Sequence, residues 1–130
     1  MKIREGRIED IKSIKEMDNV SLKAKHSFDY FTDNLGNILV AIEEDKILGY
    51  IMVKGEEVMN LVVHPDSRGK GIGRKLMEEL MKKSNRLVSR SRENNKNAID
   101  FLKNVGFKEK RKIERYYSNG DNAIEMEWRR

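Results

Sequence analysis

Three glycines at alternate positions stand between an apolar segment and an amphipathic stretch in the middle of the chain. They are Gly69, Gly71 and Gly73, within the segment Arg68-Gly-Lys-Gly-Ile-Gly-Arg74. Glycine lets backbone N–H groups turn toward a ligand without side-chain interference, and a helix start adds the positive end of its dipole. The segment therefore predicts a phosphate-binding turn between a strand and a helix.

The composition excludes several other chemistries. The 130 residues include no cysteine and two histidines, His26 and His64, so disulfides, thiolate zinc sites and thiol nucleophiles are ruled out and no metal site is predicted. The N-terminal segment has no apolar signal core, and no apolar run approaches the roughly 20 residues that span a membrane. We expect a cytoplasmic protein of one domain, residues 1–130. Its net charge of +5 favours anionic ligands.

The elements that must carry the glycine turn can be predicted from hydrophobic periodicity. Helices are predicted where apolar residues recur at helical spacing, around residues 11–20, 72–83 and 98–105, and more weakly within 23–35. Strands are predicted at residues 2–5, 38–42, 47–53, 57–64, 87–92, 107–117 and 124–129. In the last of these, Ile124, Met126 and Trp128 alternate with Glu125, Glu127 and Arg129, as in a half-buried strand.

This order of elements favours an α/β protein of the α+β type. Six to seven strands would form a mixed, mostly antiparallel sheet, and about four helices would flank it. Two nucleotide-binding motifs fail on spacing. A dinucleotide fingerprint needs Gly-x-Gly-x-x-Gly, and a P-loop needs Gly-Lys followed by Ser or Thr, and Gly69–Arg74 provides neither.

Two motifs in order carry a resemblance to a known family. Arg68-x-x-Gly71-x-Gly73 resembles the acyl-CoA-binding signature of the GNAT superfamily of N-acyltransferases, and Asn95-x-x-Ala98, in a helix that ends at Gly106-Phe107, resembles a second GNAT motif. The ending Tyr116-Tyr117 with Asp-Asn-Ala-Ile-Glu-Met126 is similar to that of the branch that acetylates protein N-termini, including the ribosomal-protein alanine acetyltransferases. The resemblance extends over almost the whole chain and implies the GNAT fold.

The resemblance implies acetyl-CoA as the acyl donor and assigns residues to it. Backbone amides of the glycine turn would bind the pyrophosphate, and the strand at Leu61–Val63 would pair with pantetheine. Asn95 would hold the other wall of the slot that pantetheine occupies. Lys70 and Arg74 would add charge attraction, or would be ordinary solvated side chains. The implied cofactor-binding residues are Leu61, Val62, Val63, Arg68, Gly69, Lys70, Gly71, Ile72, Gly73, Arg74 and Asn95.

Acyl transfer requires a neutral amine, so the cost of deprotonation shows how much a base must contribute. At pH 7 a lysine amine, with a pKa of about 10.4, costs roughly 4–5 kcal/mol to deprotonate, whereas an α-amine near 7.7–8 costs about 1 kcal/mol. Glu57 occupies the strand position at which other GNAT branches place a base, and desolvation there would make it a stronger base. The alternative is a solvated carboxylate at the start of a strand.

The sequence departs from the family at two positions. The tyrosine that often protonates the leaving thiolate is Leu102 here, and the glutamate that serves as base in the ribosomal-protein alanine branch corresponds to Arg90. The acid could then be Tyr116, Tyr117 or water, and both tyrosines would help to wall the acceptor site. Alternatively they cap the last hairpin. His64 is placed past the site, at the surface.

We predict an acetyl-CoA-dependent N-acetyltransferase that acts on a primary amine, preferably a protein or peptide α-amine, by direct attack in a ternary complex. A small-molecule amine acceptor, or a CoA-binding module without catalysis, are the alternatives. No metal, nucleic acid or membrane partner is expected, since the basic run Lys108–Lys112 is interrupted by Glu109 and is typical of a solvated edge strand. The chain would be a monomer or a homodimer.

Overall fold

The fold was described from a computed structural model, which defines residues 1–21 and 26–130. The helices of this part are α1 (Ile11–Ser21), α2 (Phe28–Asp33), α3 (Ile72–Lys82) and α4 (Lys96–Asn104), with short 3-10 turns η1 (Ile8–Asp10), η2 (Leu35–Asn37) and η3 (Pro65–Ser67). The strands are β1 (Lys2–Glu5), β2 (Ile38–Glu43), β3 (Lys46–Lys54), β4 (Glu57–Val63), β5 (Arg86–Arg92), β6 (Lys108–Ile113) and β7 (Ala123–Arg129).

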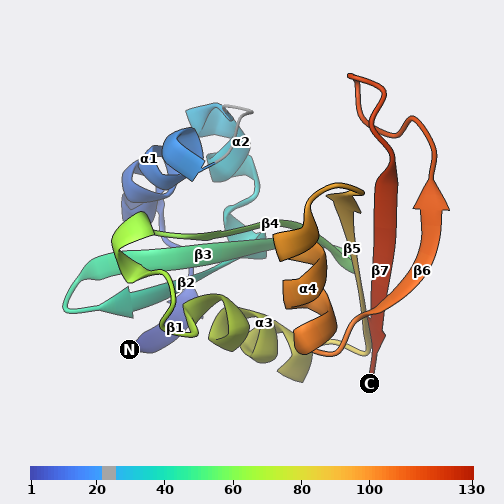
Figure 1. Cartoon of the computed structure of the whole chain (residues 1–130). Coiled ribbons are helices and arrows are strands. Elements are labelled where there is room, and N and C mark those ends of the chain that lie inside the picture. The colour runs from blue at the N-terminus through green and yellow to red at the C-terminus, as the bar shows by residue number, and fades with distance from the viewer. Residues whose placement is uncertain (22–25) are drawn as a thin grey trace. The chain divides into compact units, whose positions relative to one another are not determined.

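The chain forms two compact units, and β4 contributes to both. Unit 1 comprises residues 1–54 and 59–79, and unit 2 comprises residues 55–58 and 80–130. The strand order within unit 1 is β1-β2-β3-β4, and within unit 2 it is β4-β5-β7-β6 (Figure 1). The predicted strands and helices are therefore present, in the predicted order.

In unit 1 the strands β1, β2 and β3 pair antiparallel. Ile3 is opposite Ala41, and Val40 is opposite Tyr50. The turn between β2 and β3 uses two consecutive residues with positive φ, Glu44 at 50° and Asp45 at 67°. Two such residues give a turn whose twist matches that of the flanking strands.

Consecutive residues of β3 show why helices cover both faces of this sheet. A Cβ built on Gly49 would lie 3.5 Å from Cγ2 of Ile72, the first residue of α3. Tyr50 points the other way, into a buried cluster with Ile14 of α1 and Phe31 of α2. Because side chains alternate across a strand, α3 lies on one face, while α1 and α2 lie on the other (Figure 1).

Unit 2 is built on β5, which pairs antiparallel with β7 along its whole length and parallel with the start of β4. Glu57 is in register with Val88, whose N–H donates to the Glu56 carbonyl oxygen at 2.8 Å. The edge strand β6 pairs with β7 and is exposed from Lys108 to Lys112, as predicted for a solvated edge. Leu102 of α4 and Phe107 are buried in this unit.

Two details of unit 2 differ from the prediction. The strand predicted at residues 107–117 ends at Ile113, because Arg115 has a φ of 53° and its N–H donates to Oδ1 of Asn122 rather than to a ladder partner. Glu125, placed on the exposed face by alternation, is only 3% exposed. Arginines on both neighbouring strands cover its carboxylate, as described below.

The second predicted helix occupies only part of the segment predicted to contain it. Residues 23–35 were expected to hold a short helix, and α2 occupies Phe28–Asp33, where Ser27 caps it by accepting a hydrogen bond from the Tyr30 N–H. The part of the prediction at residues 23–25 lies outside the described residues.

Candidate active site

The glycine turn lies between β4 and α3, where the sequence predicts it. β4 ends at Val63, η3 follows at Pro65–Ser67, and α3 begins at Ile72. Gly69 and Gly71 have φ values of 80° and 77°, in the region that side chains other than glycine rarely adopt. A Cβ at either position would meet nothing within 4 Å. These glycines are therefore required by the backbone path, and space for a ligand remains beside them.

Local hydrogen bonds fix the path of the chain into this turn. The Arg68 Nε donates to the Val63 carbonyl oxygen at 3.2 Å, so the arginine of the motif holds the end of β4. The His64 Nδ1 accepts a hydrogen bond from the Asp66 N–H at 3.1 Å, and the His64 side chain is 43% exposed. His64 thus has a capping role at the surface, as the sequence suggests.

The start of α3 supplies the groups that suit an anion. The first four N–H groups of an α-helix have no intrahelical acceptor, and the first bond of this helix runs from Lys75 N–H to the Gly71 carbonyl oxygen. The helix dipole adds partial positive charge at this point. The Lys70 side chain is exposed, and Arg74 forms an exposed pair with Glu78 at 3.5 Å. Both are surface cations beside the turn.

The strand segment predicted to pair with pantetheine lies in unit 1. Val62 is 3% exposed and packs into the core, whereas Leu61 and Val63 are half-buried. β4 approaches β3 closely here, since a Cβ on Gly49 would lie 2.8 Å from the Val62 carbonyl oxygen. The His64 N–H also donates to the Leu48 carbonyl oxygen at 2.8 Å. β3 therefore supports β4 up to the glycine turn.

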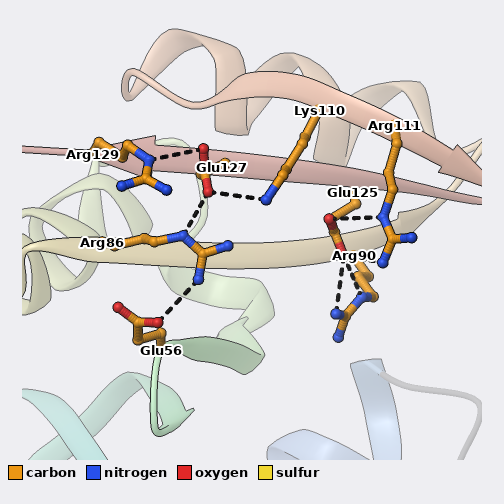
Figure 2. Close-up of polar contacts among 8 residues, drawn as sticks. All are labelled: Glu56, Arg86, Arg90, Lys110, Arg111, Glu125, Glu127 and Arg129. Atoms are coloured by element: carbon orange, nitrogen blue, oxygen red, sulfur yellow. Dashed lines mark hydrogen bonds and ion pairs between the residues drawn. The ribbon is translucent and has the colours of Figure 1, made fainter.

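In unit 2 the predicted base, Glu57, is paired with an arginine. Nη1 of Arg90 lies 2.7 Å from the Glu57 carboxylate, and its Nη2 lies 2.9 Å from the carboxylate of the buried Glu125. Arg111 of β6 bonds Glu125 as well, at 3.1 Å (Figure 2). The Glu57 side chain is 34% exposed. The sequence left a desolvated base and a solvated carboxylate open at this position, and in the structure the Glu57 carboxylate is partly exposed and ion-paired with Arg90.

This ion-pair cluster favours the charged forms of Arg90 and Glu125. Burial opposes the charge of Arg90, but bonds to Glu57 and Glu125 keep the pKa of Arg90 above its ordinary value. Hydrogen bonding by Arg111, against the effect of burial and with further help from Arg90, lowers the pKa of Glu125. Four charges of alternating sign therefore run from β4 across β5 and β7 to β6.

The two tyrosines predicted at the acceptor side contact each other and two arginines of β5. Tyr116 and Tyr117 pack edge to face, with ring centroids 5.0 Å apart. The Arg90 guanidinium lies 5.9 Å from the Tyr116 ring, and that of Arg92 lies 4.0 Å from the Tyr117 ring. Tyr116 is 45% exposed and Tyr117 is half-buried. Glu57, Tyr116 and Tyr117 thus gather around β5.

Asn95 caps α4. Its Oδ1 accepts a hydrogen bond from the Ala98 N–H at 3.2 Å, which explains the Asn-x-x-Ala spacing as the distance from an N-cap to the third residue of a helix. Leu102 of the same helix is buried, so its position holds no acid. From the sequence, Arg90 is noted only as the replacement for the glutamate base of a related branch, and Arg92 is assigned no role. Their two-residue spacing on a strand, which places both on one face, was the available signal.

The sequence comparisons agree with this geometry. Residues 34–109, which are 76 of the 130 positions, match the model of the acetyltransferase (GNAT) domain. The chain belongs to the GNAT acetyltransferase family. It has the GNAT fold, a mixed sheet of seven strands with four α-helices in the described residues.

Individual relatives differ in the acceptor that their names state. The peptidyl-lysine N-acetyltransferase YjaB of Escherichia coli is 36% identical over 66 residues, which are 51% of this chain and 45% of YjaB. The chain therefore aligns with about half of that protein. The N-alpha-acetyltransferase of Sulfurisphaera tokodaii is 26% identical over 151 aligned positions, covering 96% of this chain and 90% of the relative.

A solved structure of low sequence identity shares the fold. Arabidopsis thaliana NAA60, crystallised with acetyl-CoA, superposes with a TM-score of 0.90 over 99% of each chain at 14% identity. In the part of the chain that the structure describes, no group of three or more metal-ligating side chains occurs. None of the described helices has the length and apolar character needed to span a bilayer.

Proposed function

We propose that the protein is an acetyl-CoA-dependent N-acetyltransferase whose acceptor is the α-amine of a protein or peptide N-terminus. The observation that carries the proposal is the glycine turn. Gly69 and Gly71 have positive φ there, and the first amides of α3, which follow directly, suit an anion. Full-length similarity to the N-alpha-acetyltransferase of Sulfurisphaera tokodaii supports the acceptor class. An α-amine also needs little help from a base, about 1 kcal/mol at pH 7.

The donor would be held mainly by backbone groups. Amides of residues 69–73 would bind the pyrophosphate, and the backbone of Leu61–Val63 would pair with pantetheine. The Arg68 Nε holds the end of β4, and Arg68, Lys70 and Arg74 would add attraction for the phosphates. The Asn95 oxygen is used in capping α4, so its part in binding would fall to the amide nitrogen.

The acceptor chemistry is assigned to Glu57, Tyr116 and Tyr117. The amine attacks the thioester carbon, the C–S bond breaks, and CoA leaves as a thiolate. Glu57 would take the proton from the amine through Oε1, while its Oε2 keeps the bond from Arg90. A tyrosine O–H would supply a proton to the thiolate where one is needed, and burial raises the pKa of Tyr117, so its hydroxyl stays protonated at neutral pH.

The test is a panel of amines incubated with the full chain and acetyl-CoA, with thiol release as the readout. The panel contains peptides with a free N-terminus and no lysine, N-terminally blocked peptides with one lysine, and free amines such as polyamines. Turnover on the first group supports the proposal. Turnover confined to another group, or none at all, would remove the α-amine claim.

A second candidate, peptidyl-lysine acetylation, is favoured by the 36% identity to YjaB over 66 residues. It predicts turnover on the blocked lysine peptides, with a rate that keeps rising to higher pH than for an α-amine, because the lysine amine has the higher pKa. Free small amines and CoA binding without turnover stay as outcomes of the same panel. Cytoplasmic location and a monomeric or dimeric state also stay predictions, as does the single domain of 1–130.

A further inference from the structure

Three arginines of β5 share one face of the strand, because even numbers of positions separate them: Arg86, Arg90 and Arg92. Each arginine bonds at least one carboxylate, but only two of them also contact the side chains with a proposed catalytic role. Arg90 also touches Glu57 and lies near the Tyr116 ring, and Arg92 lies against the Tyr117 ring. These are the side chains to which the proposed function assigns the chemistry.

We propose that Arg90 and Arg92 are positioning residues of the acceptor site, which hold the Glu57 carboxylate and the two tyrosine rings in place for the incoming amine. The inference rests on the proposed function. It concerns unit 2 alone, since all five residues belong to it.

The arginines can act as fixed supports because each is anchored at a second place. Arg90 bonds the buried Glu125 through Nε at 3.0 Å and Nη2 at 2.9 Å. Arg92 donates from Nη1 to Asp121 at 2.9 Å and to Asn119 at 3.0 Å, on the segment that connects β6 and β7. A planar guanidinium that is already held by such bonds loses little further freedom when it orients another group.

The charges also act on the tyrosines directly. Burial raises the pKa of Tyr117, and the positive charges of Arg92 and Arg90 counter part of that rise. A hydroxyl that ionises more readily is a better proton donor to a leaving thiolate. The arginines would therefore orient the ring of Tyr117 and also tune its acidity. A purely structural arginine would have neither effect.

Arg86 provides an internal comparison. It forms ion pairs with Glu127 of β7 and, at 3.0 Å, with Glu56 just before β4, so it joins the same elements as Arg90 does (Figure 2). These two carboxylates, Glu127 and Glu56, have no proposed catalytic role. Removal of Arg86 should therefore cost a similar amount of cross-strand bonding without disturbing the acceptor site.

The first experiment compares Arg90→Gln, Arg92→Gln and the matched control Arg86→Gln in the full chain, by kcat and KM on the best peptide and by urea unfolding. We expect roughly a 10- to 100-fold loss of kcat/KM for Arg90→Gln, mainly in kcat, because small misplacements of reacting groups are costly. Arg86→Gln should stay within about 2-fold. Equal activity losses in the Arg90 and Arg86 variants would overturn the inference. Should Arg90→Gln not fold, Arg90→Lys takes its place, since lysine keeps the charge but lacks the planar guanidinium. Wild-type activity in Arg90→Lys would also overturn the inference.

The second experiment does not depend on turnover. Tyrosine Cζ resonances, assigned with single Tyr→Phe variants, are followed by NMR as the pH is raised. Arg92→Gln should raise the pKa of Tyr117, whereas Arg86→Gln should leave it unchanged. An unchanged Tyr117 titration in Arg92→Gln would contradict the placement of Arg92. If the wild-type chain acetylates no amine, the proposed function fails, and this titration still decides whether the arginines control the tyrosines.

Discussion

Nη1 of Arg90 lies 2.7 Å from the Glu57 carboxylate, and the same guanidinium bonds the buried Glu125. Two carboxylates on β4 and β7 therefore share one arginine on β5. Because Glu57 and Arg90 act as a unit, their removal should not be additive. The energetic coupling of the two side chains can be measured in a double-mutant cycle.

In that cycle, Glu57→Gln and Arg90→Gln should each lower kcat/KM, and the double variant should lose little more than the worse single variant. We expect a coupling energy of about 1–2 kcal/mol in transition-state stabilisation. The control cycle uses Glu56→Gln and Arg86→Gln, a pair 3.0 Å apart that should show coupling in stability but not in kcat/KM. Additive losses of activity for Glu57 and Arg90 would speak against a shared role.

The pH dependence of stability should reflect Glu127. Hydrogen bonds from Arg86, Arg129 and Lys110 lower the pKa of Glu127 from 4.5 to about 2. A carboxyl with a lowered pKa in the folded state stabilises that state fully above the unfolded pKa, and the contribution is lost as the pH falls through the folded value. The contribution of Glu127 should therefore be constant above about pH 5 and disappear between about pH 4.5 and pH 2.

The measurement is the free energy of unfolding in urea, taken from pH 7 down to pH 2 for the wild type and Glu127→Gln. The two curves should be separated at neutral pH and converge as the pH approaches 2. Glu9→Gln is a suitable control, because Glu9 lies on the exposed surface of unit 1. Parallel curves for the wild type and Glu127→Gln down to pH 2 would show that the ion pairs of Glu127 do not stabilise the folded state.

The close approach of β3 and β4 gives a prediction about packing. A Cβ at Gly49 would lie 2.8 Å from the Val62 carbonyl oxygen, which is too short and involves backbone that cannot move aside. Gly49→Ala should therefore cost about 2 kcal/mol of stability, within the usual range for overpacking, and weaken CoA binding through a shifted β4. Gly36→Ala is the matched control, since nothing lies within 4 Å of its added Cβ. Equal stability and CoA affinity in the two variants would contradict the prediction.

Much of this structure could be predicted from the sequence because local signals agree with one another. The glycine turn has a sharp signal, since Gly69 and Gly71 need backbone angles that other residues rarely adopt. The alternation in the last strand located β7, but it placed Glu125 on the exposed face. That error arose because a two-residue period reports which face a side chain takes and carries no information on what covers that face.

The surroundings of Glu57 were not predictable for a related reason. Glu57 and Arg90 are 33 positions apart, and only the register of β4 against β5 brings them together. Single-sequence patterns describe neighbours along one element, whereas this ion pair depends on which strands are adjacent. The same holds for Tyr116 and Tyr117, whose motif predicted a site but not the arginines against their rings.

A buried hydrogen-bond cluster in unit 1 escaped the sequence prediction as well. Asp18 of α1 is 0% exposed and accepts hydrogen bonds from the Tyr50 hydroxyl at 3.2 Å and the His26 N–H at 3.2 Å, and its Oδ2 lies 3.1 Å from His26 Nδ1. Burial, with the charge of Asp18, raises the pKa of Tyr50 well above its usual range. The Tyr50 hydroxyl therefore stays protonated at neutral pH and donates to Asp18.

Removal of this carboxylate should be costly, because buried donors would be left without an acceptor. We expect Asp18→Ala to destabilise the protein by about 3 kcal/mol and Tyr50→Phe by about 1 kcal/mol, as measured by urea unfolding at pH 7. The double variant should lose less than the sum, since Tyr50→Phe removes one of the donors that Asp18→Ala leaves unpaired. Asp29→Ala, at an exposed position of α2, serves as the control and should change stability by less than about 0.5 kcal/mol. An Asp18→Ala variant as stable as this control would mean that water replaces the carboxylate without cost.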